Sequence, residues 1–345
     1  MYLYASNLSQ PNGGKTVLEL RRLRLLRELS IRGTIAEVAD SLSYSPSSVS
    51  QQLSQLESEV GVELLRRTGR TLKLTAQAQL LVTHTETLLE AMEHAEADLA
   101  GTMSTVAGTV RLAVFQTAML ALIPPVLREL REKFPDLRVE MSQQEPADAL
   151  QETSSRSFDL VVAEQYSGHS APHYSNLDRR VLTHDPIRLA LPVLGAPGNE
   201  AFDQVTILEH AASLPWVVEP DGAASRHWAL QACRLAGFEP DLRYETADLQ
   251  AHVELVQTGN AVAMLPDLVL RANHSTLRTV DLPGAPARTI FTAMRRSSTK
   301  SPGIQAVRQM LHAQPGMSDA NDSVILATPQ DFDTVDEEKA SSRQK

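Results

Sequence analysis

Residues 34–75 carry the pattern that most restricts how this chain can fold. The segment opens TIAEVADSLSYSPSSVSQQLSQLE and closes LLRRTGRTLKLT. Two short amphipathic helices fit the first part, with a three-residue break between them, and a basic hairpin containing a glycine fits the second. In a winged helix-turn-helix this order of elements places the second helix in the major groove of DNA. The segment therefore predicts double-stranded DNA as a partner.

Local signals mark where the helices of this segment begin. Thr34 is expected to cap the first helix, and Glu37 three residues later completes a capping box. Ser45 is a good cap for the second helix, and Pro46 suits its first position, where the N–H would be unpaired. A further helix is expected over residues 17–30. The expected buried stripes of the three helices are Leu18, Leu25, Leu26 and Leu29; Ile35, Val38, Ala39 and Leu42; and Val49, Leu53, Leu56 and Val60.

The polar face of the second helix and the hairpin supply the candidate DNA contacts. Short polar side chains allow close approach to a duplex and can bond base edges or phosphates. Basic residues bracket a hairpin turn expected at Thr68-Gly69, which makes a wing. An ordinary solvated helix face, and a surface pair between Arg67 and Glu63, are the alternatives. The predicted contacts are Thr34, Ser45, Pro46, Ser47, Ser50, Gln51, Ser54, Arg66, Arg67, Arg70 and Lys73.

Charge and cysteine content narrow the class of protein. The 345 residues carry a net charge of −10, yet residues 15–75 hold ten basic and seven acidic residues. The basic excess thus coincides with the DNA-binding pattern. Cys233 is the single cysteine, so no intrachain disulfide can form, and it is expected to be a small core residue. With no signal-peptide pattern and no apolar run of about 18 residues, we expect a cytoplasmic protein without a membrane span.

A long helix is expected after the wing, from residue 75 to about residue 100, because this stretch lacks proline and glycine. Five apolar side chains recur at spacings close to a heptad and predict a dimerisation seam. Four glutamates, Glu86, Glu90, Glu93 and Glu96, are expected on the outer face. The seam residues are Leu81, Leu88, Met92, Ala95 and Leu99.

From residue 109 the pattern alternates between strands and helices, which predicts an α/β domain with mainly parallel sheets. Strands are expected over residues 110–115, 137–141, 158–163, 187–191, 216–218, 242–245, 261–265 and 289–294. Helices are expected over residues 119–133, 147–156, 223–236, 249–258 and 304–313.

Several motifs together resemble the LysR-type transcriptional regulators. They are SPSSVSQQLSQLE at 45–57, GVELLRR at 61–67, LT at 74–75, LIPPVL at 122–127, FPDLRVE at 134–140, FDLVV at 158–162 and GNAVAMLP at 259–266. The resemblance covers roughly residues 17–313. It implies a dimerising linker helix and an effector domain of two Rossmann-like lobes, similar to periplasmic binding proteins, with a small-molecule effector between the lobes.

The resemblance and the patterns give one division of the chain. We expect a disordered lead (1–14), a winged helix-turn-helix domain (15–75), a linker helix and hinge (76–108), an effector domain (109–314) and a disordered acidic tail (315–345). Lobe I would hold residues 109–183 and 286–314, and lobe II residues 184–285. The chain would cross between the lobes near residues 182–186 and 282–287.

Three segments of the effector domain are expected to converge in one cleft. Thr117 matches a family position that meets effectors, and two of the three segments precede helices, whose N-termini bind carboxylates. The sequence offers no side chain with a fixed positive charge in these segments, so an anionic effector would be held by N–H and hydroxyl donors. Ordinary turns and caps are the alternative. The predicted effector contacts are Gln116, Thr117, Gln143, Gln144, Pro220, Asp221, Gly222, Ala224 and Ser225.

Other functions find less support in the sequence. No phosphate-binding loop, dinucleotide fingerprint or nucleophile motif is present, so we expect neither an enzyme nor a cofactor. His169 and His173 are separated by four residues, but Gly168 and Pro172 indicate a loop and not a metal site. The alternative function is a ligand-binding or transport-type α/β protein without DNA binding. A regulator would act as a dimer or tetramer, with RNA polymerase as a further partner.

Overall fold

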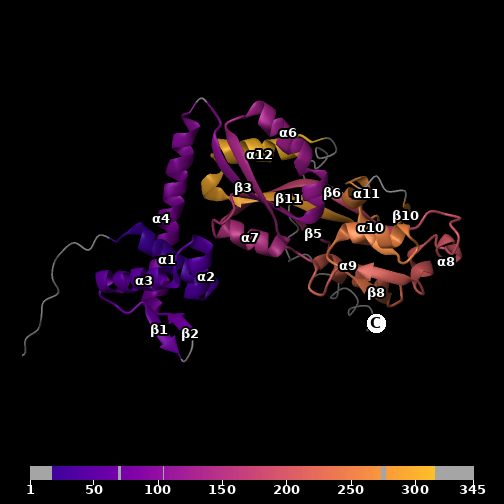
Figure 1. Ribbon diagram of the computed structural model, residues 1–345, viewed down its shortest axis with the longest axis horizontal. Helices are drawn as coiled ribbons and strands as arrows, with labels where there is room; N and C mark the ends of the chain where they lie inside the picture. Colours follow the sequence, from indigo (N-terminus) through magenta and orange to yellow (C-terminus); the bar gives the residue numbers. More distant parts are fainter. Residues whose placement is uncertain (1–17, 69–70, 104, 273–276, 315–345) are drawn as a thin grey trace, which may run out of the picture. The chain divides into compact units, whose positions relative to one another are not determined.

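The computed structural model describes residues 18–68, 71–103, 105–272 and 277–314 (Figure 1). The chain forms two compact units, Met1–Thr102 and Met103–Lys345, here called the N-terminal and C-terminal units. The lead at 1–14, the tail at 315–345, Gly69 and Arg70 lie outside the described residues.

The N-terminal unit is a winged helix-turn-helix followed by a long helix. Three helices share one apolar core with the base of a two-stranded hairpin, and Leu26, Val38, Val49 and Leu56 are fully enclosed in it. Thr34 accepts a hydrogen bond from the Glu37 N–H. The elements are α1 (Leu20–Arg32), α2 (Ile35–Leu42), α3 (Pro46–Val60), β1 (Leu65–Thr68), β2 (Thr71–Leu74) and α4 (Ala76–Gly101).

The helix signals read from the sequence of this unit are confirmed. Ser45 accepts a hydrogen bond from the Ser48 N–H, and Pro46 occupies the first position of α3. Substituting such a capping residue by alanine costs about 1 kcal/mol. Ser43 adopts a left-handed conformation, φ 56°, to close the break between α2 and α3.

Three expectations for this unit are wrong. The helix α1 begins at Leu20, so Leu18 is exposed and outside the buried stripe. Thr68 pairs with Thr71 as the last residue of β1, so Thr68 belongs to the strand and not to the turn expected at Thr68-Gly69. Glu86 is not on the outer face of α4, because its carboxylate accepts from Arg27 Nε at 2.5 Å. Arg27 lies on α1, is buried and also bonds Glu28. The ion pair between Arg27 and Glu86 therefore fastens α4 to α1.

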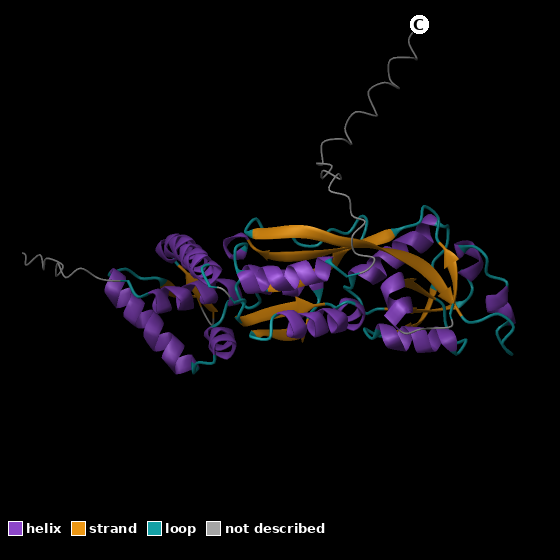
Figure 2. Cartoon of the chain, turned by 90° about the horizontal axis from the view of Figure 1, so that it is seen from above, coloured by secondary structure: helices purple, strands orange, loops and turns teal. Residues whose placement is uncertain are grey.

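The C-terminal unit is a two-lobed α/β domain built around a seven-stranded mixed sheet. Figure 2 shows its helices on both sides of the strands. Its main elements are β3 (Gly108–Val114), α5 (Gln116–Ala121), α6 (Ile123–Lys133), β4 (Leu137–Gln143), α7 (Pro146–Ser154), β5 (Leu160–Gln165), β6 (Leu177–Leu191), β7 (Pro215–Val218), α9 (Ala224–Leu235), β8 (Asp241–Glu245), α10 (Leu249–Gln257), β9 (Ala263–Pro266), α11 (Asp267–Ala272), β10 (Arg278–Asp281), β11 (Ala287–Arg295) and α12 (Pro302–His312).

The expectation of mainly parallel sheets is wrong. Strand β3 runs parallel to β4 and β5, and β7 runs parallel to β8. By contrast, β11 is antiparallel to both β5 and β6, and β6 is antiparallel to β9 and β10. The first part of β6 was missed because its run of charged residues, LDRRVLTHDP, does not resemble a buried strand.

The two lobes of the C-terminal unit have separate apolar cores, and two stretches of the chain connect them. Leu182 packs in the core formed with α6 and α12, whereas Ile187, on the same strand β6, packs in a second core with Trp216. Where the chain passes back from the second lobe to the first, Leu282 belongs to the second core and Ile290, on β11, belongs to the first. The lobes are therefore joined by β6 and by the segment that leads into β11.

The helix expected over residues 119–133 is two helices. It starts earlier, at Gln116, and breaks at Leu122, which ends α5 and precedes α6. Pro124 and Pro125 follow the break, where they lack the N–H groups that a continuous helix would use. Short elements that the sequence did not indicate include α8 (Glu200–Asp203), η1 (Leu208–Ala211), α11, β10 and η2 (Arg296–Ser298).

Candidate functional site

The outer face of α3 is polar and open. Val49, Leu53 and Leu56 are buried on one side of the helix, and the four predicted contacts on the other side are all exposed. The Ser45 and Ser47 hydroxyls lie 3.0 Å apart in a mutual hydrogen bond at the start of the helix. A helix that fixes its apolar side and presents short polar side chains on the other can approach a duplex closely. The exposed four are Ser47, Ser50, Gln51 and Ser54.

The two described arginines of the wing differ in their surroundings. Arg66 donates to Glu63 at 3.0 Å, so the surface pair considered for Arg67 is made by its neighbour. Among the described residues no ion pair holds Arg67, and both Arg67 and Lys73 are exposed. An exposed ion pair such as the one between Arg66 and Glu63 contributes little to stability, so Arg66 is only weakly held.

Glu57 was missed by the sequence reasoning, although it ends the SQLE motif. Its carboxylate, at the end of α3, accepts hydrogen bonds from the Leu64 and Leu65 N–H groups at 2.8 and 2.9 Å. Thr75 adds a bond from its hydroxyl to the Glu63 carbonyl at 2.8 Å. These bonds fix the base of the wing to α3, so both predicted DNA-contacting elements are held as one body.

The outer part of α4 exposes most of the predicted seam. Leu88, Met92 and Leu99 are 48, 45 and 66 % exposed, and Ala95 is exposed beside them. Leu81 differs, because it is half-buried against the core of the N-terminal unit. An apolar stripe of this kind on a helix indicates a surface that a partner covers.

The predicted effector residues differ in their exposure and in the groups that they contact. Thr117 is 1 % exposed, and its hydroxyl accepts a hydrogen bond from Arg288 Nη2 at 2.7 Å. Gln116 instead reaches α10, where its Oε1 accepts from the Leu249 N–H at 3.1 Å and its Nε2 donates to Asp248 at 2.9 Å. Gln143, Asp221 and Gly222 are exposed, whereas Gln144, Pro220, Ala224 and Ser225 are half-buried.

Arg288 places a fixed positive charge beside Thr117, although it lies outside the three predicted segments. The side chain is buried, donates to Asp185 at 2.7 and 2.9 Å and to Glu164, and stacks over the Phe115 ring at 5.2 Å. Burial lowers the pKa of Arg288, but the two carboxylates outweigh it and the pKa is raised. Burial raises the pKa of Asp185 and of Glu164, and Arg288 opposes both shifts. The sequence could not reveal this cluster, because Arg288 is 171 residues from Thr117.

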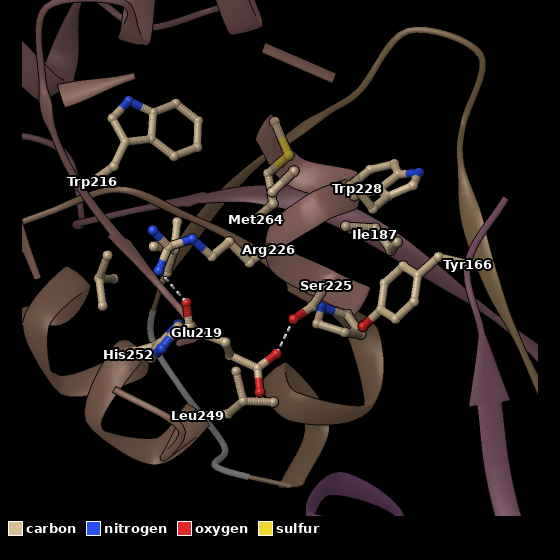
Figure 3. A pocket seen from close by; sticks show the side chains of 14 residues that line it. Tyr166, Ile187, Trp216, Glu219, Ser225, Arg226, Trp228, Leu249, His252 and Met264 are labelled. Atoms are coloured by element: carbon tan, nitrogen blue, oxygen red, sulfur yellow. Dashed lines mark hydrogen bonds between the residues drawn. The ribbon is translucent and has the colours of Figure 1, made fainter. Parts of the chain in front are cut away.

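A small cavity lies in the second lobe, beside Glu219 (Figure 3). Its volume is about 30 Å³, room for about two water molecules. Ser225 is the predicted effector residue that lines it. The other walls include Tyr166, Trp216, Trp228, Leu249, His252 and Met264.

Glu219 and His252 are two of the titratable residues that line this cavity. Burial, reinforced by the carboxylates of Glu164 and Glu145, raises the pKa of Glu219 to about 7 despite the hydrogen bond from Ser225. Burial lowers the pKa of His252, whose Nε2 lies 2.8 Å from the Thr246 carbonyl. A carbonyl only accepts, so this nitrogen carries a proton, and Nδ1 of the neutral ring is an acceptor.

A larger cavity of about 490 Å³ lies on the other side of Trp228. It is lined by Leu208, Gln231, Leu235, Leu282 and Pro286, and Leu235 is 83 % exposed. None of the predicted effector residues lines it.

Among the described residues, no group of three or more metal-ligating side chains occurs. No described helix has the length and apolar content that a bilayer span requires. Cys233 is buried, as expected, and burial raises the pKa of its thiol to about 12. The reactive thiolate is therefore suppressed.

Two family descriptions match the chain. Residues 20–79 match "Bacterial regulatory helix-turn-helix protein, lysR family", and residues 104–316 match "LysR substrate binding domain". GltC of Bacillus subtilis, a transcriptional dual regulator, is 28 % identical over 72 % of this chain and 81 % of its own. IlvY of Escherichia coli is 26 % identical over 86 % of this chain and 95 % of its own.

The fold is also similar to solved structures. A full-length OxyR variant from Pseudomonas aeruginosa superposes with a TM-score of 0.66 and 16 % identity, covering 90 % of this chain and 99 % of its own. A second Pseudomonas aeruginosa structure, described as a LysR family regulator, gives a TM-score of 0.51 at 19 % identity over 85 % of this chain and 98 % of its own.

Proposed function

Because the chain belongs to the LysR family of DNA-binding transcriptional regulators, which are not enzymes, we propose that α3 and the wing together form its DNA-reading surface. The observation that carries this proposal is the bonding of the wing to α3 through Glu57, beside a fully exposed polar helix face. The match over residues 20–79 excludes the alternative of a ligand-binding protein without a DNA-binding domain.

A gel shift with DNA from upstream of the gene tests this surface. We expect the full chain to retard that fragment at a concentration where random DNA of equal length stays free. Glu57→Gln should weaken binding, because one carboxylate that accepts two wing N–H groups becomes a poorer acceptor. Glu37→Gln, at the exposed start of α2, is the matched control. Equal retardation of specific and random DNA would refute a sequence-reading role.

We further propose that the chain self-associates through the exposed stripe of α4, as a dimer that can pair into a tetramer. Leu88→Asp combined with Met92→Asp places like charges in the stripe and should dissociate the dimer. Sedimentation of this variant, beside Leu80→Asp on the same helix outside the stripe, measures the effect. A double variant that sediments like the parent would place assembly elsewhere.

The C-terminal unit is the effector-binding domain, and we propose that its effector enters beside Tyr166, Glu219 and Ser225, at the cavity in the second lobe. The anionic effector expected from the sequence would have to compete with the bonds that Arg288 and the start of α10 already make. RNA polymerase is a further proposed partner, and the cytoplasm, where the DNA is accessible, is the proposed location.

Thr117→Val tests the link between the two lobes and the response. The variant removes the acceptor of an Arg288 hydrogen bond but leaves the N-terminal unit intact. We expect unchanged DNA binding and a lost response to an inducer. A variant that responds at the parent's inducer concentration would show that this cluster is not coupled to the effector.

A further inference from the structure

The charged side chains that line the cavity beside Glu219 determine which charge a ligand should carry. The Glu219 carboxylate accepts a hydrogen bond from the Ser225 hydroxyl, and among the described residues no basic side chain pairs with it. Arg226 lines the same cavity, but its guanidinium bonds the Glu219 main-chain carbonyl and the carboxylate of Glu245. A half-buried carboxylate without a cation is costly, and a positively charged ligand removes that cost.

Two groups that could attract an anion, the start of α10 and the Arg288 guanidinium, already have acceptors from the chain. At the start of α10, Asp248 accepts from the Gln250 N–H at 2.9 Å and Gln116 accepts from the Leu249 N–H at 3.1 Å. The buried Arg288 is bonded by Asp185 and Glu164. An anion that used either group would therefore have to displace an acceptor of the chain.

The remaining walls suit a small cation with an apolar body. Tyr166 and Trp228 lie with their ring centroids 6.1 Å apart, on one side of the Glu219 carboxylate (Figure 3). Ring faces attract ammonium groups within about 6 Å. Met264 and Ile187 supply aliphatic surface, and His252 Nδ1 offers an additional acceptor.

We propose that the cavity beside Glu219 takes an effector that carries a protonated amine on a small apolar body, with the ammonium group paired to the Glu219 carboxylate. The inference rests on the proposed effector-binding function and specifies the ligand class. The cavity must widen from its present volume of about 30 Å³ to admit such a molecule.

Tryptophan fluorescence of the full chain tests the proposal. The chain has two tryptophans, Trp216 and Trp228, and both line this cavity. We would titrate isobutylamine, isobutanol and isobutyrate, which share one branched body, at pH 8, where the amine is protonated. The amine should bind at least tenfold more tightly than the alcohol or the carboxylate.

Matched variants assign that preference to Glu219. Glu219→Gln should weaken amine binding at least tenfold, while Glu239→Gln, an exposed glutamate of the same lobe paired with Arg234, should leave it unchanged. Tighter binding of isobutyrate, no binding of any probe, or an equal loss in both variants would overturn the inference.

A gel shift on the same samples separates this inference from the proposed function. A chain that retards its upstream DNA but does not bind the amine refutes only the ligand class. A chain that binds the amine but no DNA refutes the proposed function and supports the ligand class.

Discussion

The arginines assigned to DNA in the N-terminal unit and the central arginine of the C-terminal unit use their charge in opposite ways. In the described part of the N-terminal unit, Arg66, Arg67 and the serines assigned to DNA are exposed, and Arg67 has no ion-pair partner among the described residues. In the C-terminal unit the central arginine, Arg288, is 1 % exposed and bonded on several sides. The first arrangement leaves charge free for an external polyanion, and the second uses charge to hold the protein together. The same residue type is therefore available for binding where it is exposed, as at Arg67, and contributes to stability where it is buried and paired, as at Arg288.

The largest expected effect tests the stabilising role of Arg288. Arg288→Ala leaves Asp185 buried without its cation, and breaking such a pair costs about 3–5 kcal/mol. Chemical denaturation should show this loss in the transition of the C-terminal unit. Arg67→Ala should change the free energy of unfolding by less than about 0.5 kcal/mol. Similar values for both variants would remove the contrast between the units.

The second expected effect is a pH dependence of stability that comes from Glu219, whose half-buried carboxylate has no cationic partner among the described residues. The pKa of Glu219 is about 7, above the ordinary 4.5, so the folded state keeps the proton longer than the unfolded state does. Stability should therefore fall as pH rises from about 4.5 to 7, by at most about 3.5 kcal/mol at about 1.4 kcal/mol per pH unit, and then level off. Subtracting the profile of Glu219→Gln from that of the parent isolates this part. A flat difference would show that Glu219 ionises normally.

The sequence predicted the N-terminal unit better than the C-terminal unit, for a physical reason. Caps at Thr34 and Ser45 and the stripe of α3 depend on neighbours within four residues, and all three are as expected. The cluster around Arg288 joins residues separated by 103, 124 and 171 positions, and no local pattern encodes such pairing. Thr117 was identified by family resemblance, yet the sequence could not show that its hydroxyl is bonded to Arg288.

Base discrimination is the third effect and concerns only the N-terminal unit. Gln51→Ala with Ser50→Ala should reduce discrimination between the operator and random DNA by about 1–3 kcal/mol per lost base contact. Gln55→Ala, on the same helix and hydrogen-bonded to Glu59 at 3.3 Å, is the control. Competition gel shifts with random DNA measure the ratio. If affinity for random DNA falls equally, these side chains position α3 and do not read bases.

The smallest effect compares two adjacent arginines of the wing. Arg67 is exposed without an ion pair among the described residues, whereas Arg66 is paired with Glu63 at 3.0 Å. A cation that neutralises one phosphate contributes about 0.9 to the slope of log affinity against log salt. Arg67→Ala should reduce that slope by about one and weaken binding to all sequences. Arg66→Ala should reduce it by less, because Glu63 already offsets the charge that is lost.

Filter-binding titrations from low to moderate salt resolve the two slopes. Equal slopes would mean that the pair with Glu63 opens on DNA, and that exposure rather than pairing governs how the wing uses its charge.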